Sequence, residues 1–226
     1  MLELFCTEGA DVRHPTVVAS ALELGIRTNV VSEHVAATLS ETRAPQGVIA
    51  VCAMPDVSLS TVLATSPRLV AVLVDVSDPG NAGTVIRAAD AAGADAVVFA
   101  GTTVDPYNGK CVRASTGSIF HLPVVTDVAV TTAVDAMRDA GLSVVAADGS
   151  APIDVEQADA QGLLADRTAW FFGHEVRGLA SDAPLAADHV VRIPIHGRAE
   201  SLNLATAAAV CLYASARAQR RTTNSG

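Results

Sequence analysis

The chain has 226 residues, enough for one large domain or two small ones, and half of them are hydrophobic, so it can bury a continuous core. Aromatic residues make up only 4% of the chain, which argues against a platform that stacks nucleic-acid bases. A net charge of -9 argues against non-specific nucleic-acid binding, because phosphate contacts require cations. A local cluster can still be positive, and all of its cations except Lys110 would be arginines.

No run of 18 apolar residues is free of charge, and the N-terminus lacks the pattern of a secretion signal. We therefore expect a cytoplasmic protein without a membrane partner. The cysteines are far apart, with no CxxC spacing and no histidine cluster nearby, so we expect reduced thiols and no metal ion. They are Cys6, Cys52, Cys111 and Cys211.

Residues 1–57 carry short apolar runs and a helical stretch, and they predict a small α/β unit. The helical stretch PTVVASALELG ends at Gly25, and the extended segment GVIAVCAM begins at Gly47. Residues 58–68 follow as a short helix or linker, in which Pro67 marks a break.

From Leu69 onwards, strands alternate with helices. LVAVLVDV is a continuous apolar strand, DPGNAG is a turn, and TVIRAADAAG is a helix that ends at Gly93. Further strands are AVVFAG, LPVV, LSVVAAD, AWFFG and VVRIPI, with a helix at VTTAVDAMRDAG and a long alanine-rich helix from about Leu202. This alternation predicts an α/β domain with a parallel sheet over residues 69–221, followed by a disordered tail at 222–226.

Three polar segments follow predicted strands, and in open α/β sheets that edge is where ligands bind. The amides of DPGNAG could hold an anion at a helix start, yet the spacing matches neither a dinucleotide fingerprint nor a P-loop. Asn81 is equally suited to be a turn residue or a cap, and Arg87 an exposed partner of Asp90. In WFFGHEVRGL, charges follow Gly173, which an ion pair in a capped turn also explains. In IPIHGRAESLN, Ser201 is also suited to be a helix N-cap.

Together and in this order, the segments resemble the motifs of the SpoU (TrmH-like) branch of the SPOUT RNA methyltransferases, over residues 69–218. The pattern NxGxxxR appears as Asn81, Gly83 and Arg87. His174 stands where the second motif commonly has asparagine. The patterns FGxExxGL and IPxxGxxESLN appear as Phe172, Gly173, Glu175, Gly178 and Leu179, and as Ile193, Pro194, Gly197, Glu200, Ser201, Leu202 and Asn203.

The resemblance implies a parallel α/β sheet whose C-terminal part forms a deep trefoil knot, with S-adenosylmethionine bound inside the knot. It places Arg87 beside the reacting ribose hydroxyl. Because the pKa of arginine exceeds about 12, we assign Arg87 to lowering the pKa of the hydroxyl rather than to accepting its proton. The residues that would orient the reactants are Asn81, Glu175, Ser201 and Asn203. Those that would enclose the methyl donor are Phe172, Gly173, Ile193, Pro194, Gly197 and Leu202.

The segment before the knot resembles the second half of a small ribosomal-protein-like RNA-binding domain. Such domains are usually longer, so we expect an N-terminal truncation. The resemblance also implies a homodimer with RNA lying across the subunit interface. Candidates for phosphate contacts are Lys110, Arg113 and Ser115, although an exposed surface loop explains these residues as well.

These features predict an S-adenosylmethionine-dependent RNA 2'-O-ribose methyltransferase, and 23S ribosomal RNA is the expected substrate. Three alternatives stay open at this point. The first is a transfer RNA 2'-O-methyltransferase, the second is a non-catalytic RNA-binding or ribosome assembly factor with the same fold, and the third is an oxidoreductase that uses the Asn81 turn for NAD. A role in thiopeptide resistance is a special case of the main hypothesis.

Overall fold

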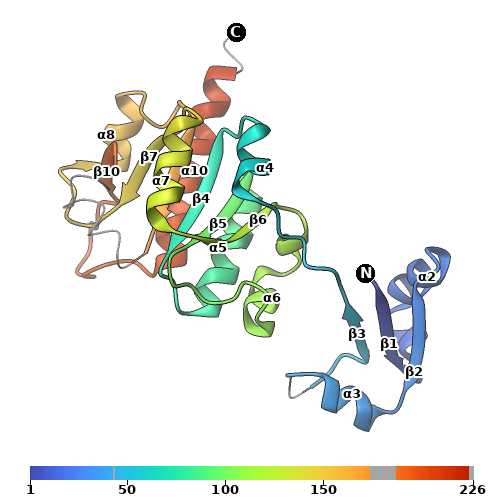
Figure 1. Ribbon diagram of the computed structural model, residues 1–226. Helices are drawn as coiled ribbons and strands as arrows, with labels where there is room; N and C mark the ends of the chain where they lie inside the picture. Colours follow the sequence, from blue (N-terminus) through green and yellow to red (C-terminus); the bar gives the residue numbers. More distant parts are fainter. Residues whose placement is uncertain (43, 174–186, 224–226) are drawn as a thin grey trace. The chain divides into compact units, whose positions relative to one another are not determined.

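The computed structural model describes residues 1–42, 44–173 and 187–223, and it divides into two compact units, Met1–Met54 and Pro55–Gly226 (Figure 1). The first unit is a small α/β unit, as the sequence predicts. In its three-stranded sheet, the central strand β1 (Glu3–Thr7) pairs in parallel with β2 (Arg27–Val31) and antiparallel with β3 (Val48–Val51). Its helices are α1 (Ala10–Arg13), α2 (Pro15–Glu23) and α3 (Glu33–Leu39).

The second unit contains a seven-stranded sheet in the order β6-β5-β4-β9-β7-β10-β8, and its strand pairs are parallel, which confirms the predicted α/β class. The central strands are buried along their whole length, as expected for a parallel sheet covered on both faces. The strands are β4 (Leu69–Val74), β5 (Ala96–Ala100), β6 (Val124–Val128), β7 (Ser143–Ala147), β8 (Ile153–Asp154), β9 (Thr168–Phe172) and β10 (His189–Arg192).

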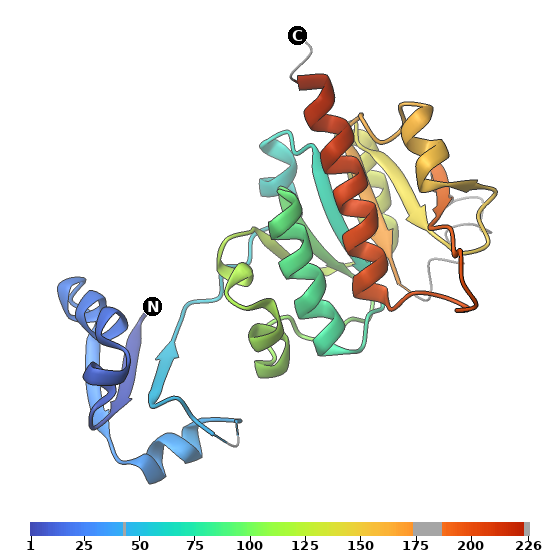
Figure 2. The ribbon, with the colours of Figure 1, turned by 180° about the vertical axis from the view of Figure 1, so that it is seen from behind.

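Helices cover both faces of this sheet, and alternate residues of β4 supply two separate cores. Leu69, Ala71 and Leu73 belong to the core under α5 (Pro79–Ala92), α6 (Gly109–Ser115), the 3-10 helix η1 (Ser118–Phe120), α8 (Val155–Ala160) and α10 (Leu204–Thr223). Val70, Val72 and Val74 belong to the core under α4 (Leu59–Ala64) and α7 (Val130–Asp139). Figure 2 shows α5 and α10 side by side on their face. The continuous apolar strand is therefore explained by burial on both faces.

The structure corrects one boundary that is important for the site. The sequence predicts a turn at DPGNAG, whereas α5 begins at Pro79, so most of this segment is the first turn of the helix. The Asp78 side chain caps the helix by accepting a hydrogen bond from the backbone N–H of Asn81 at 2.9 Å. Proline suits the first helical position, because its missing N–H would have no partner there. The sequence predicted a turn here because Gly80 and Gly83 are residues typical of turns.

Helix α10 packs against the sheet through small side chains and one buried hydrogen bond. Ala205, Ala208 and Cys211 are buried in this face, and the Trp170 Nε1 group of β9 donates a hydrogen bond to Ser215 Oγ at 2.8 Å. The helix continues to Thr223, so it includes the first two residues of the segment at 222–226 for which the sequence predicts disorder. Within the described ranges, no helix is long and apolar enough to cross a membrane.

The trefoil knot stays a prediction, because the chain path between β9 and β10 runs through residues 174–186, which lie outside the described residues. In the sheet, β9 and β10 do not lie beside the strands that immediately precede them in the sequence. Strand β9 inserts between β4 and β7, and the chain then crosses to β10 on the other side of β7. Helix α10 finally returns to pack against β4, β9 and α5.

Replacing Ser215 with alanine should destabilise the protein, because the buried N–H of Trp170 loses its acceptor. An unsatisfied buried donor costs about 1–3 kcal/mol, and we expect the free energy of unfolding to fall by that amount. Chemical denaturation followed by the fluorescence of Trp170, the single tryptophan, measures the change. Thr206→Ala is the matched control on the exposed side of α10 and should change stability by less than about 0.5 kcal/mol. Equal stabilities of the two variants would contradict the assigned role of the hydrogen bond.

Candidate active site

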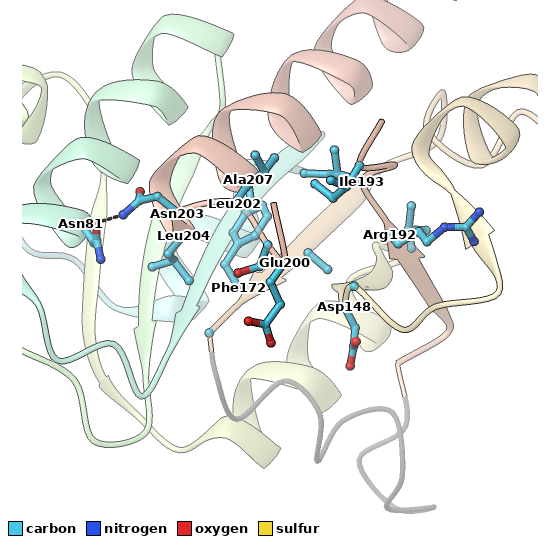
Figure 3. A pocket seen from close by; sticks show the side chains of 16 residues that line it. Asn81, Asp148, Phe172, Arg192, Ile193, Glu200, Leu202, Asn203, Leu204 and Ala207 are labelled. Atoms are coloured by element: carbon cyan, nitrogen blue, oxygen red, sulfur yellow. Dashed lines mark hydrogen bonds between the residues drawn. The ribbon is translucent and has the colours of Figure 1, made fainter. Parts of the chain in front are cut away.

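A cavity of about 610 Å³ opens at the carboxyl ends of β7, β9 and β10, beside the first turns of α5 and α10 (Figure 3). Four of the residues predicted to enclose the donor line it: Phe172, Gly173, Ile193 and Leu202. Three of those predicted to orient the reactants line it as well: Asn81, Ser201 and Asn203. The fold therefore brings residues from the three motifs, which are far apart in the sequence, to one pocket.

Gly173 shapes this pocket because β9 ends directly against the neighbouring strand. A Cβ atom at this position would lie 2.1 Å from the carbonyl oxygen of Val74, at the end of β4. No side chain can be accommodated at that distance without a backbone shift, so glycine is required here. The preceding residue, Phe172, is almost completely buried and stacks on Trp170 with ring centroids 5.9 Å apart. The aromatic pair and the glycine together give this side of the pocket a fixed shape.

The Asn203 side chain joins two helix starts at the other side of the pocket. Its Nδ2 group donates a hydrogen bond to Asn81 Oδ1 at 3.0 Å (Figure 3). Its Oδ1 atom accepts from the backbone N–H of Ala205 at 2.9 Å, which caps the first turn of α10. Asn203 therefore takes the capping role that the sequence suggests for Ser201.

Two carboxylates at the pocket were not among the predicted site residues. Asp148 follows β7 and Glu200 precedes α10, and Figure 3 shows both side chains pointing to the same side of the pocket. Arg192 also lines the pocket, but its guanidinium is used elsewhere, because it donates to the carbonyl oxygens of Ala151 and Pro152 and pairs with Asp154. The sequence carried only a weak signal for Asp148, namely its position directly after the buried strand in LSVVAAD.

Several other predicted residues lie away from the lining of the cavity. Arg87 is exposed on α5, nearly two turns after Asn81 and on a different side of the helix. Pro194 and Gly197 belong to the segment between β10 and α10 but are not among the residues that line the cavity. Glu175 and its neighbour His174 lie outside the described residues.

The three candidates for phosphate contacts have different surroundings. Lys110 Nζ lies 2.9 Å from Asp78 Oδ1, and this hydrogen bond is the main reason that the pKa of Asp78 is below its usual range. Ser115 is fully buried, and its hydroxyl donates to the carbonyl oxygen of Val112 at 2.8 Å, so it stabilises α6 and is not accessible to a phosphate. Arg113 lies in the last turn of α6.

The two buried thiols of the second unit, Cys111 and Cys211, are not suited to nucleophilic or metal chemistry. Burial raises the pKa of Cys111 to about 11 and raises the pKa of Cys211 as well, so both stay protonated at neutral pH. In the part of the chain that the structure describes, no group of three histidine, cysteine or acidic residues could hold a metal ion.

The parallel sheet and a pocket at its carboxyl edge define an α/β protein that binds an organic ligand of nucleotide size. Residues 68–213 match the SpoU rRNA Methylase family, and residues 1–58 match the RNA 2'-O ribose methyltransferase substrate binding family. The first match covers more than half of the chain. The chain therefore belongs to the SpoU rRNA methylase family.

Individual proteins agree with this assignment. The chain is 38% identical over 205 residues to the 23S rRNA (guanosine(2553)-2'-O)-methyltransferase RlmP of Bacillus subtilis, with 89% of this chain and 77% of that protein covered. It is 36% identical to a 23S rRNA (uridine(2479)-2'-O)-methyltransferase of Streptomyces viridochromogenes, over 78% of this chain and 62% of that protein. The crystal structure of the SpoU methyltransferase AviRb of Streptomyces viridochromogenes with AdoMet superposes with a TM-score of 0.76 at 29% identity, covering 98% of this chain and 83% of the other.

Gly173→Ala should distort the pocket, because the new Cβ atom would meet the Val74 carbonyl oxygen and force the backbone to shift. The strain of overpacking amounts to about 1–3 kcal/mol, so we expect S-adenosylmethionine to bind about tenfold more weakly and the melting temperature to fall. Isothermal titration calorimetry and thermal denaturation measure the two effects. Gly149→Ala is the matched control at the same pocket, because its Cβ atom would meet nothing within 4 Å. If Gly173→Ala bound the donor as tightly as the control did, the close approach would have no bearing on the pocket.

Proposed function

We propose that this protein transfers the methyl group of S-adenosylmethionine to a ribose 2'-hydroxyl of 23S ribosomal RNA in the cytoplasm. The observation that carries the proposal is the meeting of three motif segments at one pocket in a chain of the SpoU family. The names of the Bacillus and Streptomyces relatives favour 23S rRNA over transfer RNA. The AdoMet complex of AviRb favours S-adenosylmethionine over NAD. We assign residues 1–57 to RNA binding, 58–68 to a linker and 69–221 to methyl transfer.

The direct test is transfer of a tritiated methyl group from S-adenosylmethionine to isolated 23S rRNA and, in a parallel reaction, to bulk transfer RNA. We expect label in 23S rRNA, at a nucleotide whose 3'-phosphodiester bond resists alkaline cleavage after the reaction because its 2'-oxygen is methylated. Label in transfer RNA alone would support the alternative substrate. No transfer to either RNA, together with binding of RNA, would support the non-catalytic assembly factor.

The chemistry of the pocket fits the donor. Phe172, Ile193 and Leu202 supply apolar surface for an adenine ring, and Gly173 contributes to the lining beside them. The carboxylates of Asp148 and Glu200 are suited to hydroxyl and cationic groups of the ligand. When bound, S-adenosylmethionine supplies a sulfonium-activated methyl group. The reaction needs no metal ion, so the task of the protein is to align the acceptor and to increase its nucleophilicity.

Different residues of this chain align the acceptor and increase its nucleophilicity. Asn81 and Asn203 hold each other in place by their hydrogen bond and supply amide groups that can orient a ribose. Alignment of this kind is worth up to about 7–11 kcal/mol of the barrier. The positive charge of Arg87 would lower the pKa of the 2'-hydroxyl and stabilise negative charge that develops on its oxygen. A phosphate oxygen of the RNA is then the acceptor of the proton.

The position of Arg87 suggests how the site is completed. Arg87 is exposed on α5 and does not line the pocket of its own chain. Helix α10, which packs against α5, exposes Val210 and Tyr213, the latter 52% accessible, and this is apolar surface of the kind that dimers bury. We therefore propose a homodimer in which Arg87 of one copy serves the pocket of the other. Lys110 and Arg113 remain candidates for contacts with the RNA backbone.

Arg87→Ala should lower the single-turnover rate of methyl transfer about 100-fold, because the developing charge loses its stabilising cation. The Kd of S-adenosylmethionine should stay within about twofold of the wild type, since the interaction that is lost is made in the transition state. Rapid-quench measurement of tritium transfer and calorimetry give the two quantities. Arg138→Ala, on α7 at the opposite face of the sheet, is the control and should keep the wild-type rate. Methylation by Arg87→Ala at the wild-type rate would remove Arg87 from the mechanism.

When S-adenosylmethionine is far below its Kd for the Gly173→Ala variant, a mixture of Arg87→Ala with Gly173→Ala should be more active than either variant alone. In a mixed dimer, the intact pocket of the Arg87→Ala chain receives Arg87 from the Gly173→Ala chain, so one of two sites works. Random exchange of subunits makes half of the dimers mixed, and we expect about a quarter of the wild-type rate. If Arg87 instead served its own pocket, no mixed dimer would hold a complete site, and the mixture would show only the average of the activities of the two variants.

A further inference from the structure

A chain of polar contacts connects the starts of three helices at the active site. Lys110, in the first turn of α6, contacts Asp78 Oδ1 at 2.9 Å. The other carboxylate oxygen of Asp78 accepts the backbone N–H of Asn81 at 2.9 Å. The Asn81 side chain in turn accepts from Asn203, the capping residue of α10, at 3.0 Å. Asn81 and Asn203, the two asparagines in this series of contacts, line the pocket.

The two oxygens of Asp78 have separate partners, which limits rotation of the carboxylate. One oxygen accepts a charge-assisted hydrogen bond from Lys110 on α6. The other accepts the backbone N–H of Asn81, whose side chain lines the pocket. A neutral cap such as asparagine or serine would offer one oxygen for the two donors. Gly80 lies close to both side chains of this ion pair. A Cβ atom on Gly80 would be 3.2 Å from Asp78 Oδ2 and 3.3 Å from Lys110 Cε.

Capping of α5 alone would not require this arrangement. Asparagine and serine cap helices about as well as aspartate does, so a neutral residue would satisfy the helix start equally. Exposed ion pairs also add little to stability, and the side chains of Lys110 and Asp78 are 60% and 46% accessible. The contact between Lys110 and Asp78 therefore has little value for folding.

We propose that Asp78 is a positioning residue for methyl transfer, held by Lys110 and acting through Asn81. This inference rests on the proposed function. Asp78 does not line the pocket and touches neither reactant in our assignment. Instead, it determines where the Asn81 side chain presents its amide to the ribose and to Asn203. The single lysine of the chain would thus have a role within the protein, distinct from the phosphate contact that its charge suggests.

The test uses Asp78→Asn and Lys110→Met in the full-length chain. Each should lower the single-turnover rate on 23S rRNA about tenfold and weaken S-adenosylmethionine binding about threefold, while the KM for RNA changes little, because alignment rather than encounter is affected. Lys110→Arg should recover most of the rate, since it restores a cation and a donor. Ser58→Ala, which removes the side-chain cap of α4, is the control for loss of a helix cap and should keep the wild-type rate.

Combination with Asn81→Ala decides whether Asp78 acts through Asn81. In that background, Asp78→Asn should cause no further loss of rate, because the group that it positions is gone. Wild-type rates for Asp78→Asn and Lys110→Met would overturn the proposal, and so would independent, multiplicative losses in the double variant. A raised KM for RNA with unchanged kcat would overturn it in favour of a phosphate contact by Lys110. If the wild type itself methylated no RNA, the proposed function would fail and the inference with it.

Discussion

The hydrogen bond between Asn81 and Asn203 is the contact on which the active site depends. It joins side chains 122 positions apart in the sequence, one at the start of α5 and the other at the start of α10. Both helices begin at the carboxyl edge of the sheet, because each follows a parallel strand. The contact closes one side of the pocket, while the approach of Gly173 to Val74 sets the other. The pocket therefore exists only when the ends of the methyltransferase domain are folded against each other.

Small residues allow the helices and strands around the pocket to pack closely. Helix α5 approaches α6 so closely that a Cβ atom on Gly83 would lie 2.3 Å from the carbonyl oxygen of Cys111. Helix α10 buries alanines against the sheet, and Ser215 satisfies the one buried indole. The low aromatic content of the chain is consistent with this close packing of backbones, and three of the largest buried side chains, Trp170, Phe171 and Phe172, lie together on β9. Gly83 of the first motif and Gly173 of the second have a steric role, and Asn81 and Asn203 have a polar one.

The sequence predicted the parallel sheet and the alternation of strands with helices, because a short, continuous apolar run such as β4 is typical of a strand that is buried on both faces. It did not predict the strand order, since the placing of β9 between β4 and β7 depends on contacts between distant segments. The start of α5 was assigned wrongly because its glycines are typical of turns. Asp148 was missed because a single acidic residue after a strand is a weak signal. Ser115 was included for its polarity, although its hydroxyl is satisfied inside α6.

Binding of S-adenosylmethionine measured by calorimetry across a double-mutant cycle of Asn81→Ala and Asn203→Ala tests the central claim most directly. We expect the wild type to bind one donor per chain and each single variant to bind it more weakly. The double variant should bind about as weakly as the weaker single variant, with a coupling of about 0.5–3 kcal/mol. Absence of donor binding by the wild type, or losses that add without coupling, would contradict a pocket built on this contact.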